Sequence, residues 1–293
     1  MSSTQFMLPN TTQLACFEEL TQYIPWPKIT KDIADINHIC LSAGNKIMHF
    51  HRGDYQQERK ADNSVVTQAD FEADTIIQKG LADLSLSLPV LSEEKLVDWQ
   101  TRKAWGTYWL VDPLDGTKSF VEGKTNFTVN IALIHENNAI LGFIYAPFHQ
   151  ELFIGSPSIG SYRWKNERWT KLNARSKPHY APNRSLDLLV STSYNKQIEG
   201  LLDQWQIKQW QGQPMGSSIK FCRIAEGQAD LYPRLKPTSE WDTAAGQAIL
   251  EGAGGKVMNL EGIPLNYNTK EDLLNPWFIA SAYLEKNWFP VTL

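Results

Sequence analysis

The chain has few cysteines and no regular cysteine spacing. Three cysteines, Cys16, Cys40 and Cys222, occur among its 293 residues. Their odd number and wide spacing argue against a disulfide framework and against a zinc site. A reducing compartment is the simplest setting for such a chain, so we expect a cytoplasmic protein. Cys40 and Cys222 fall on apolar helical patterns, which indicates inert core positions.

Long apolar runs and an excess of positive charge are also missing. No segment approaches the ~20 apolar residues of a membrane-spanning helix. The N-terminus lacks the basic start and apolar core of an export signal. We therefore expect no stable membrane insertion, and we leave open a peripheral position at the inner membrane. The 28 basic and 32 acidic residues give a formal net charge of −4, which argues against a nucleic-acid polymer as partner. A small anionic substrate needs only local positive charge.

What is present is an alternation of helical and strand patterns, which predicts an α/β fold. A hairpin is expected at residues 135–139, so part of the sheet should be antiparallel. Residues 1–30 form an N-terminal arm without clear periodicity. The polar stretch 155–186 suggests a boundary near residue 160, which divides the chain into subdomains 31–160 and 161–293. We expect the protein to be a monomer or a homodimer. The expected helices are 33–52, one after Thr67, 195–205, 216–226 and 242–253. The expected strands are 88–91, 107–111, 126–134, 140–146, 151–155, 187–191, 207–211, 229–232, 256–258 and 277–282.

The most informative segment places two carboxylates, Asp112 and Asp115, directly after an apolar run. Pro113 should stop the strand ladder, and Gly116 should allow a tight turn before a helix that begins at Thr117. Paired acids hold hard cations through oxygen, and the free N–H groups of a first helical turn receive phosphate oxygens. Taken alone, however, an Asp-Pro-x-Asp-Gly string is more often an ordinary turn.

Two further acidic clusters lie at the edges of apolar elements. Glu93 and Glu94 follow a short apolar run, where adjacent acids are usually solvated surface. Asp242 stands at a predicted helix start, where an acid is normally a cap. The small residues at 244–246 then suggest close packing or close approach of a ligand. If the three clusters converge, they form a multi-metal site.

With these segments the chain resembles the inositol monophosphatase superfamily of magnesium-dependent, lithium-sensitive phosphatases. Residues 112–120 match the family pattern Asp-Pro-(Ile/Leu)-Asp-Gly-Thr-x-x-Phe, residues 93–94 match its Glu-Glu, and residues 241–246 match Trp-Asp-x-x-Ala-Gly. The match extends from about residue 35 to about residue 280. It implies a layered α/β/α/β/α sandwich with the active site between two subdomains.

Within the superfamily, the chain is more similar to the bacterial 3'(2'),5'-bisphosphate nucleotidases. The supporting segments are residues 60–67, 128–134, 216–222 and 225–234. This resemblance implies removal of the 3'-phosphate from adenosine 3',5'-bisphosphate, a by-product of sulfate assimilation, with release of AMP. The alternatives are an inositol or related sugar monophosphatase, and a non-catalytic relative that binds phosphate ligands.

The resemblance also implies roles for individual residues around two or three Mg²⁺ ions. Glu93, Asp112 and the Leu114 carbonyl would hold one ion, and a third, weaker ion would touch Glu93. Asp112, Asp115 and Asp242 would hold the ion at the leaving group. A Thr117–Asp70 pair would orient the attacking water, with Glu93 as a further catalytic residue. Without the family, Asp70 is better explained as a helix-capping acid. The implied substrate-binding residues are Glu93, Leu114, Asp115, Gly116, Thr117, Gly216, Lys220, Arg234 and Asp242.

Arg234 is the residue that we expect to determine which substrate is bound. It occupies the position at which inositol monophosphatases have a glutamate that binds sugar hydroxyls, and a cation suits a second phosphate better. The alternatives are a surface arginine and, for Lys220, a solvated helix residue. One departure concerns base recognition, because Tyr194 replaces the histidine that is usual in the subgroup. Lys60 could assist phosphate or metal-water positioning, although an exposed lysine is the simpler interpretation.

Overall fold

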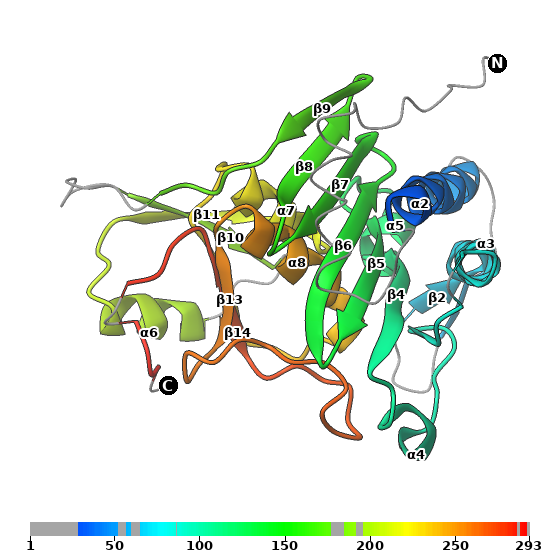
Figure 1. The fold of residues 1–293 in the computed structure, drawn as a ribbon. Helices are drawn as coiled ribbons and strands as arrows, with labels where there is room; N and C mark the ends of the chain where they lie inside the picture. Colours follow the sequence, from blue (N-terminus) through cyan, green and yellow to red (C-terminus); the bar gives the residue numbers. More distant parts are fainter. Residues whose placement is uncertain are drawn as a thin grey trace.

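The computed structural model describes residues 29–51, 57–59, 65–85, 87–176, 185–191, 196–285 and 288–291. These residues form alternating layers of helix and sheet (Figure 1). The expected N-terminal arm lies outside the described residues, except for its last two positions. Cys16, Lys60 and Tyr194 also lie outside them.

The larger sheet has seven strands in the order β3-β4-β5-β6-β7-β8-β9. Only β3 and β4 run parallel, and every other neighbouring pair is antiparallel. Helices α2 (Ile29–His51) and α3 (Gln68–Ala82) cover its outer face, where apolar side chains of both helices join the core of the sheet. The strands are β3 (Val90–Ser92), β4 (Thr107–Asp115), β5 (Thr128–His135), β6 (Asn138–Ala146), β7 (Glu151–Ser156), β8 (Gly160–Lys165) and β9 (Arg168–Lys171).

The hairpin expected near residue 137 is present, because β5 and β6 pair antiparallel around it. Strands β8 and β9, in contrast, were not predicted, and they carry the sheet past residue 160 to Lys171. The polar composition of this stretch suggested a subdomain boundary, but Trp164 and Trp169 pair across the two strands and pack on the core. The division of the chain into two subdomains stays a prediction.

The second sheet has five strands in the order β11-β10-β12-β14-β13. Strand β10 runs parallel to both of its neighbours, whereas β14 is antiparallel to β12 and β13. Helix α6 (Lys196–Gln204) packs its apolar face on this sheet through Leu201 and Leu202. The strands are β10 (Leu186–Val190), β11 (Trp210–Pro214), β12 (Leu231–Arg234), β13 (Lys256–Asn259) and β14 (Phe278–Ser281).

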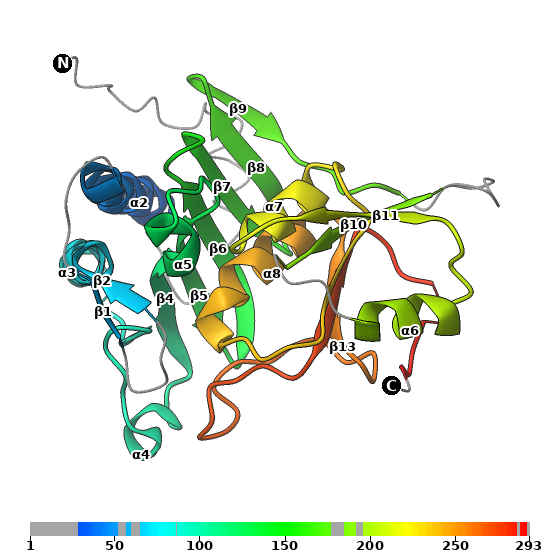
Figure 2. The same cartoon turned by 180° about the vertical axis from the view of Figure 1, so that it is seen from behind.

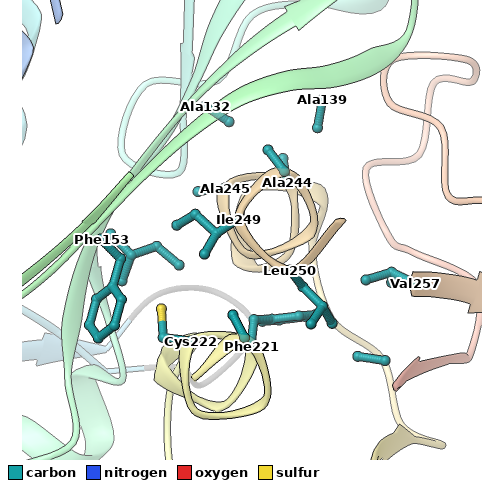
Figure 3. Packing of buried hydrophobic residues seen from close by; sticks show 14 of the residues in the cluster. Ala132, Ala139, Phe153, Phe221, Cys222, Ala244, Ala245, Ile249, Leu250 and Val257 are labelled. Carbon is teal, nitrogen blue, oxygen red and sulfur yellow. The ribbon is translucent and has the colours of Figure 1, made fainter. Parts of the chain in front are cut away.

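Helices α7 (Ile219–Ala225) and α8 (Ala244–Gly252) form a layer between the two sheets (Figure 2). Small residues bring α8 very close to the large sheet. A Cβ atom added at Gly142 of β6 would lie 2.3 Å from the Ala245 carbonyl oxygen. In Figure 3, Ala244 and Ala245 of this helix lie beside Ala132 and Ala139 of the sheet. The small residues at 244–246 therefore serve close packing.

The resulting order of layers confirms the α/β sandwich that the resemblance implied. Cys40 and Cys222 are buried as expected, and burial raises the pKa of both thiols. Among the described residues, no helix combines the length and apolarity that crossing a membrane requires. The remaining elements are β1 (Gln57–Arg59), β2 (Val65–Thr67), α4 (Trp99–Arg102), α5 (Thr117–Val121) and the 3₁₀ turn η2 (Glu240–Asp242).

Candidate active site

A bulge at the end of β4 presents the first two carboxylates. The sequence predicted that the strand would end at Val111, before Pro113. The ladder is instead interrupted between Asp112 and Asp115 and resumes where Asp115 pairs with Thr128. Pro113 lies inside the bulge, where its missing N–H does not matter to the ladder. The Leu114 N–H donates to Asp112 Oδ1 at 3.0 Å. The second oxygen, Oδ2, is buried and has no hydrogen-bond partner among the described residues.

Asp242 reaches the same place from the other half of the chain. The helix expected to begin at Asp242 begins at Ala244, and Asp242 ends the preceding turn η2. The Ser239 N–H donates to Asp242 Oδ2 at 2.9 Å, so Asp242 does cap this turn. It also converges with the bulge, because carboxylate oxygens of Asp112, Asp115 and Asp242 all lie within 4.8 Å of one another.

The three converging carboxylates repel one another, and the pKa values of all three are raised. Burial raises the pKa of Asp112 well above its ordinary value, and the charges of Glu93, Asp115 and Asp242 raise it further. Burial, with Asp115 and Glu93, raises the pKa of Asp242 to about 8. Burial also raises the pKa of Asp115, although Lys220 opposes this shift. A hard divalent cation would relieve the repulsion and would satisfy the orphaned Asp112 oxygen. The residues present therefore fit a metal centre.

Glu93 lies near the three aspartates but is not part of the group whose carboxylate oxygens lie within 4.8 Å of one another. Its N–H donates to the Val111 carbonyl at 3.1 Å, which extends the β3–β4 pairing by one residue. The Glu93 charge contributes to the raised pKa values of both Asp112 and Asp242. Glu93 is partly buried, so the interpretation as a fully solvated surface acid does not hold.

Asp70 and Thr117 form a pair next to the carboxylates. The Thr117 hydroxyl lies 2.9 Å from Asp70 Oδ1 and 3.0 Å from the Leu114 carbonyl oxygen. The other Asp70 oxygen accepts the Thr67 N–H at 2.8 Å and the Thr67 hydroxyl at 2.6 Å. Asp70 is thus the expected helix-capping acid, in a capping box with Thr67 at the start of α3, and it still presents one oxygen to Thr117. Burial raises the pKa of Asp70, against several hydrogen bonds that lower it.

A small cavity of about 100 Å³ adjoins Asp115 and Asp242. The side chains of Lys220 and Arg234, which were expected to bind substrate, also line it. Lys220 is 5 % exposed, so it is not a solvated helix residue. Its ammonium donates to the Ser217 carbonyl and lies 4.7 Å from the centroid of the Tyr232 ring. Burial lowers the pKa of Lys220 to about 8, although Asp115 opposes this shift. Arg234 is partly buried and donates to Ser191 Oγ at 2.6 Å and to the Pro237 carbonyl at 3.0 Å.

Two glycines bring the halves of the site together. Gly116 has φ +94°, a left-handed conformation that glycine adopts readily. A Cβ atom there would lie 2.9 Å from the Asn126 carbonyl oxygen, and one at Gly216 would lie 2.9 Å from Ser119 Oγ. The absence of a side chain at Gly116 lets the segment before β5 approach closely, and its absence at Gly216 lets the loop before α7 approach Ser119 of α5.

Residues 33–289 match the family model described as the inositol monophosphatase family. The chain belongs to this family.

Curated relatives and solved structures agree with this assignment. The chain is 42% identical over 248 residues to the 3'(2'),5'-bisphosphate nucleotidase CysQ of Escherichia coli strain K12, covering 84% of this chain and 97% of that protein. It is 40% identical to CysQ of Buchnera aphidicola, covering 88% of this chain and 95% of that protein. The crystal structure of CysQ from Bacteroides thetaiotaomicron superposes with a TM-score of 0.71 at 37% identity, covering 87% of this chain and 98% of that one. An inositol monophosphatase from Thermotoga maritima, at 23% identity and a TM-score of 0.68 over 86% of this chain and 92% of that one, shares the fold.

In this member of the inositol monophosphatase family, sequence reasoning assigned no role to the residues that hold Asp115. The Ser218 N–H donates to Asp115 Oδ2, and the Ser218 hydroxyl donates to Asn130 Oδ1 at 2.8 Å. Since that proton is used, Thr128 donates its own hydroxyl proton to Ser218 Oγ, also at 2.8 Å. Polar residues at 128 and 130, on one face of an otherwise apolar strand, were the available signal.

Proposed function

We propose that this protein is a Mg²⁺-dependent 3'(2'),5'-bisphosphate nucleotidase that converts adenosine 3',5'-bisphosphate to AMP and phosphate. One observation carries the proposal: three converging carboxylates adjoin both a Thr–Asp hydroxyl pair and a cavity with two cations. The high identity to CysQ proteins over most of the chain supports the choice of substrate. A role in sulfate assimilation, which this activity would serve, is part of the proposal.

The metal ligands of the proposed enzyme come from both halves of the chain. Glu93, Asp112 and the Leu114 carbonyl would hold one Mg²⁺, and Asp112, Asp115 and Asp242 would hold a second. Glu93 would also touch a third, weaker ion. When bound, such ions neutralise the phosphate, lower the pKa of a coordinated water and stabilise the leaving oxygen. Asp112 could contribute to both ligand sets, because its buried Oδ2 has no hydrogen-bond partner among the described residues and a cation would satisfy it.

The protein side chains would then direct the attacking water. Thr117 can accept a proton from the water at Oγ1 while it donates its own proton to Asp70 Oδ1. Thr67 holds the other Asp70 oxygen, which keeps the carboxylate aimed at Thr117. The raised pKa of Asp70 makes it a better proton acceptor than an ordinary aspartate. Glu93 would contribute to the same step as a metal ligand.

Two groups of residues would recognise the substrate. The N–H groups of Gly116 and Thr117, at the start of α5, would receive oxygens of the phosphate that is removed. Lys220 and Arg234 would bind the second phosphate, and Gly216 would let the nucleotide approach the loop before α7. A pair of partly desolvated cations suits a dianion far better than the hydroxyl groups of a neutral polyol.

A substrate panel tests the proposal. Phosphate release is measured from adenosine 3',5'-bisphosphate, adenosine 3'-monophosphate and inositol 1-phosphate, each with Mg²⁺ and with a chelator. We expect the bisphosphate to be hydrolysed fastest and only with Mg²⁺. Preference for inositol 1-phosphate would favour the sugar monophosphatase alternative. A folded, Mg²⁺-loaded protein that releases phosphate from none of the three would favour the non-catalytic alternative.

A further inference from the structure

Helix α3 presents two carboxylates, one helical turn apart, to two different parts of the site. Asp70 accepts a hydrogen bond from Thr117, as described above. Asp74 accepts one from the Ser92 hydroxyl, with 2.5 Å between Ser92 Oγ and Asp74 Oδ1. Asp74 is 9 % exposed and Ser92 is fully buried. Residues four apart on a helix lie on the same face, so one face of α3 reaches both Thr117 and Ser92.

Ser92 opens the tight turn that carries Glu93. The Lys95 N–H donates to the Ser92 carbonyl at 3.2 Å and closes the turn. Inside it, the Glu94 N–H approaches Ser92 Oγ at 3.4 Å. Because the Ser92 hydroxyl gives its only proton to Asp74, its lone pairs remain free to face the Glu94 N–H. The Asp74–Ser92 contact therefore joins α3 to the turn on either side of Glu93.

This turn needs an anchor because its strand is short and lies at the edge of the sheet. Strand β3 has three residues and, among the strands that the structure describes, pairs only with β4. Few ladder hydrogen bonds therefore resist a shift of the residues that follow it. A hydrogen bond to an ionised carboxylate is roughly twice as strong as one between neutral groups. Gln78, one turn further along α3, approaches the same Asp74 oxygen at 3.4 Å and helps to orient it.

We propose that Asp74 is a positioning residue that fixes the Glu93 turn through Ser92. One rigid helix thereby aligns the Asp70–Thr117 pair and the Glu93 ligand at the same time. The inference rests on the metal centre of the proposed function and adds two residues outside the set of candidate ligands. It predicts that Asp74 and Ser92 affect Mg²⁺ binding itself, before any substrate is present.

The test measures Mg²⁺ binding without substrate. Thermal melting and titration calorimetry give the Mg²⁺ concentration for half-saturation in the wild type, Ser92→Ala, Asp74→Ala and the double variant. Removing a group that orients a metal ligand costs roughly 10- to 100-fold in metal affinity, so we expect an increase of this size in both single variants. The double variant should be no worse than the more affected single variant, because the two residues act as one unit. Asp74→Asn keeps an oxygen that can accept from Ser92, so it should bind Mg²⁺ better than Asp74→Ala.

A second aspartate–serine pair, in which Asp32 is buried and Ser85 is exposed, provides a control. The Ser85 hydroxyl donates to Asp32 Oδ2 and the Ser85 N–H donates to Asp32 Oδ1 at 3.2 Å, which ties α2 to the segment after α3. No candidate metal ligand adjoins this pair in the sequence. Asp32→Ala and Ser85→Ala should lower the melting temperature and leave Mg²⁺ half-saturation unchanged.

The inference is overturned if Ser92→Ala and Asp74→Ala behave like the control pair, with lower melting temperature and unchanged Mg²⁺ half-saturation. Additive losses in the double variant, or a wild type that binds no Mg²⁺, would also overturn it. If Asp74→Ala does not fold, Ser92→Ala decides alone, since it removes only one oxygen atom. Failure of the proposed substrate is separate: a wild type that binds Mg²⁺ but releases no phosphate from the bisphosphate refutes the nucleotidase assignment, while the Mg²⁺ titrations still decide the role of Asp74.

Discussion

Thr117 Oγ1 lies 2.9 Å from Asp70 Oδ1, although 47 positions separate the two residues in the sequence. Each residue stands in the first turn of its helix, Asp70 in α3 and Thr117 in α5. Two helix starts thus face each other beside the acidic cluster. A hydroxyl held in this way can relay a proton to the carboxylate, which a threonine exposed to solvent could not do reliably.

We expect Thr117→Ala and Asp70→Ala each to lower kcat by ~10²-fold or more, the range of general acid–base contributions. The double variant should lose little beyond the larger single effect, because groups that act as a unit are not additive. Single-turnover phosphate release measures all three. Thr75→Ala is the matched control, since Thr75 is exposed on the same helix and should leave kcat unchanged. Independent losses that multiply in the double variant would show that the two residues do not share the water.

Asp112→Asn should abolish phosphate release, with a loss of at least about 100-fold, while the protein stays folded. A neutral amide binds hard cations more weakly than a carboxylate does, and a lost ligand should matter at least as much as the 10- to 100-fold of an outer group. Without Mg²⁺ the melting temperature should not fall, because the change removes one of several like charges. Circular dichroism and phosphate release measure the two effects. Asp35→Asn, on the exposed face of α2, is the control. Normal turnover in folded Asp112→Asn would remove the metal-centre hypothesis.

Stabilisation by Mg²⁺ should increase with pH. In the folded protein without metal, the pKa of Asp242 is raised from 3.8 to about 8. Burying the ionised Asp242 carboxylate therefore lowers the free energy of unfolding. This loss of stability grows as the pH rises from 3.8 to about 8. The melting temperature without metal should fall across this window, and the increase caused by Mg²⁺ should be larger at pH 8.5 than at pH 5.5. Asp242→Asn should flatten both dependences. An increase that is equal at the two pH values would argue against metal binding to deprotonated Asp242.

Adenosine 3',5'-bisphosphate should be a much better substrate than adenosine 3'-monophosphate. Each hydrogen bond to a charged group contributes roughly 1.5–3 kcal/mol, so one contact from Arg234 or Lys220 should change kcat/KM more than about tenfold. Arg234→Glu should shrink this preference. Arg168→Glu makes the same change of charge at an exposed site on β9 and should have no effect on it. Equal efficiency on both nucleotides, unchanged by Arg234→Glu, would defeat this assignment and leave the phosphatase assignment intact.

Ca²⁺ should inhibit in competition with Mg²⁺. Its bonds to oxygen are longer and its coordination looser, so the attacking water should be misplaced relative to Thr117. Initial rates at fixed substrate, with both ions varied, measure the competition. Full activity with Ca²⁺ alone would show that the site tolerates a different coordination geometry.

The sequence determined the local features because neighbouring residues specify them. The helix expected at residues 33–52, the helix-capping role of Asp70 and the helix start at Thr117 each depend on contacts within a few positions. The structure contains all three. The three acidic motifs were also visible, although a local pattern could not distinguish a helix cap from a ligand. Asp70 and Asp242 are in fact both caps, each with a carboxylate that also faces the site.

Only the tertiary structure decided which of these groups meet. Close packing of α8 on the large sheet, through Gly142 and Ala245, sets the distance at which Asp242 faces Asp112 and Asp115. The Ser218 network around Asp115, the burial of Lys220 and the contact between Asp74 and Ser92 also depend on segments far apart in the chain. Strands β8 and β9 were missed for the same reason. Their polar residues form strands because two tryptophans, one on each strand, pair with each other and pack on the core. Such contacts are fixed by how layers pack, and no local spacing in the sequence records that packing.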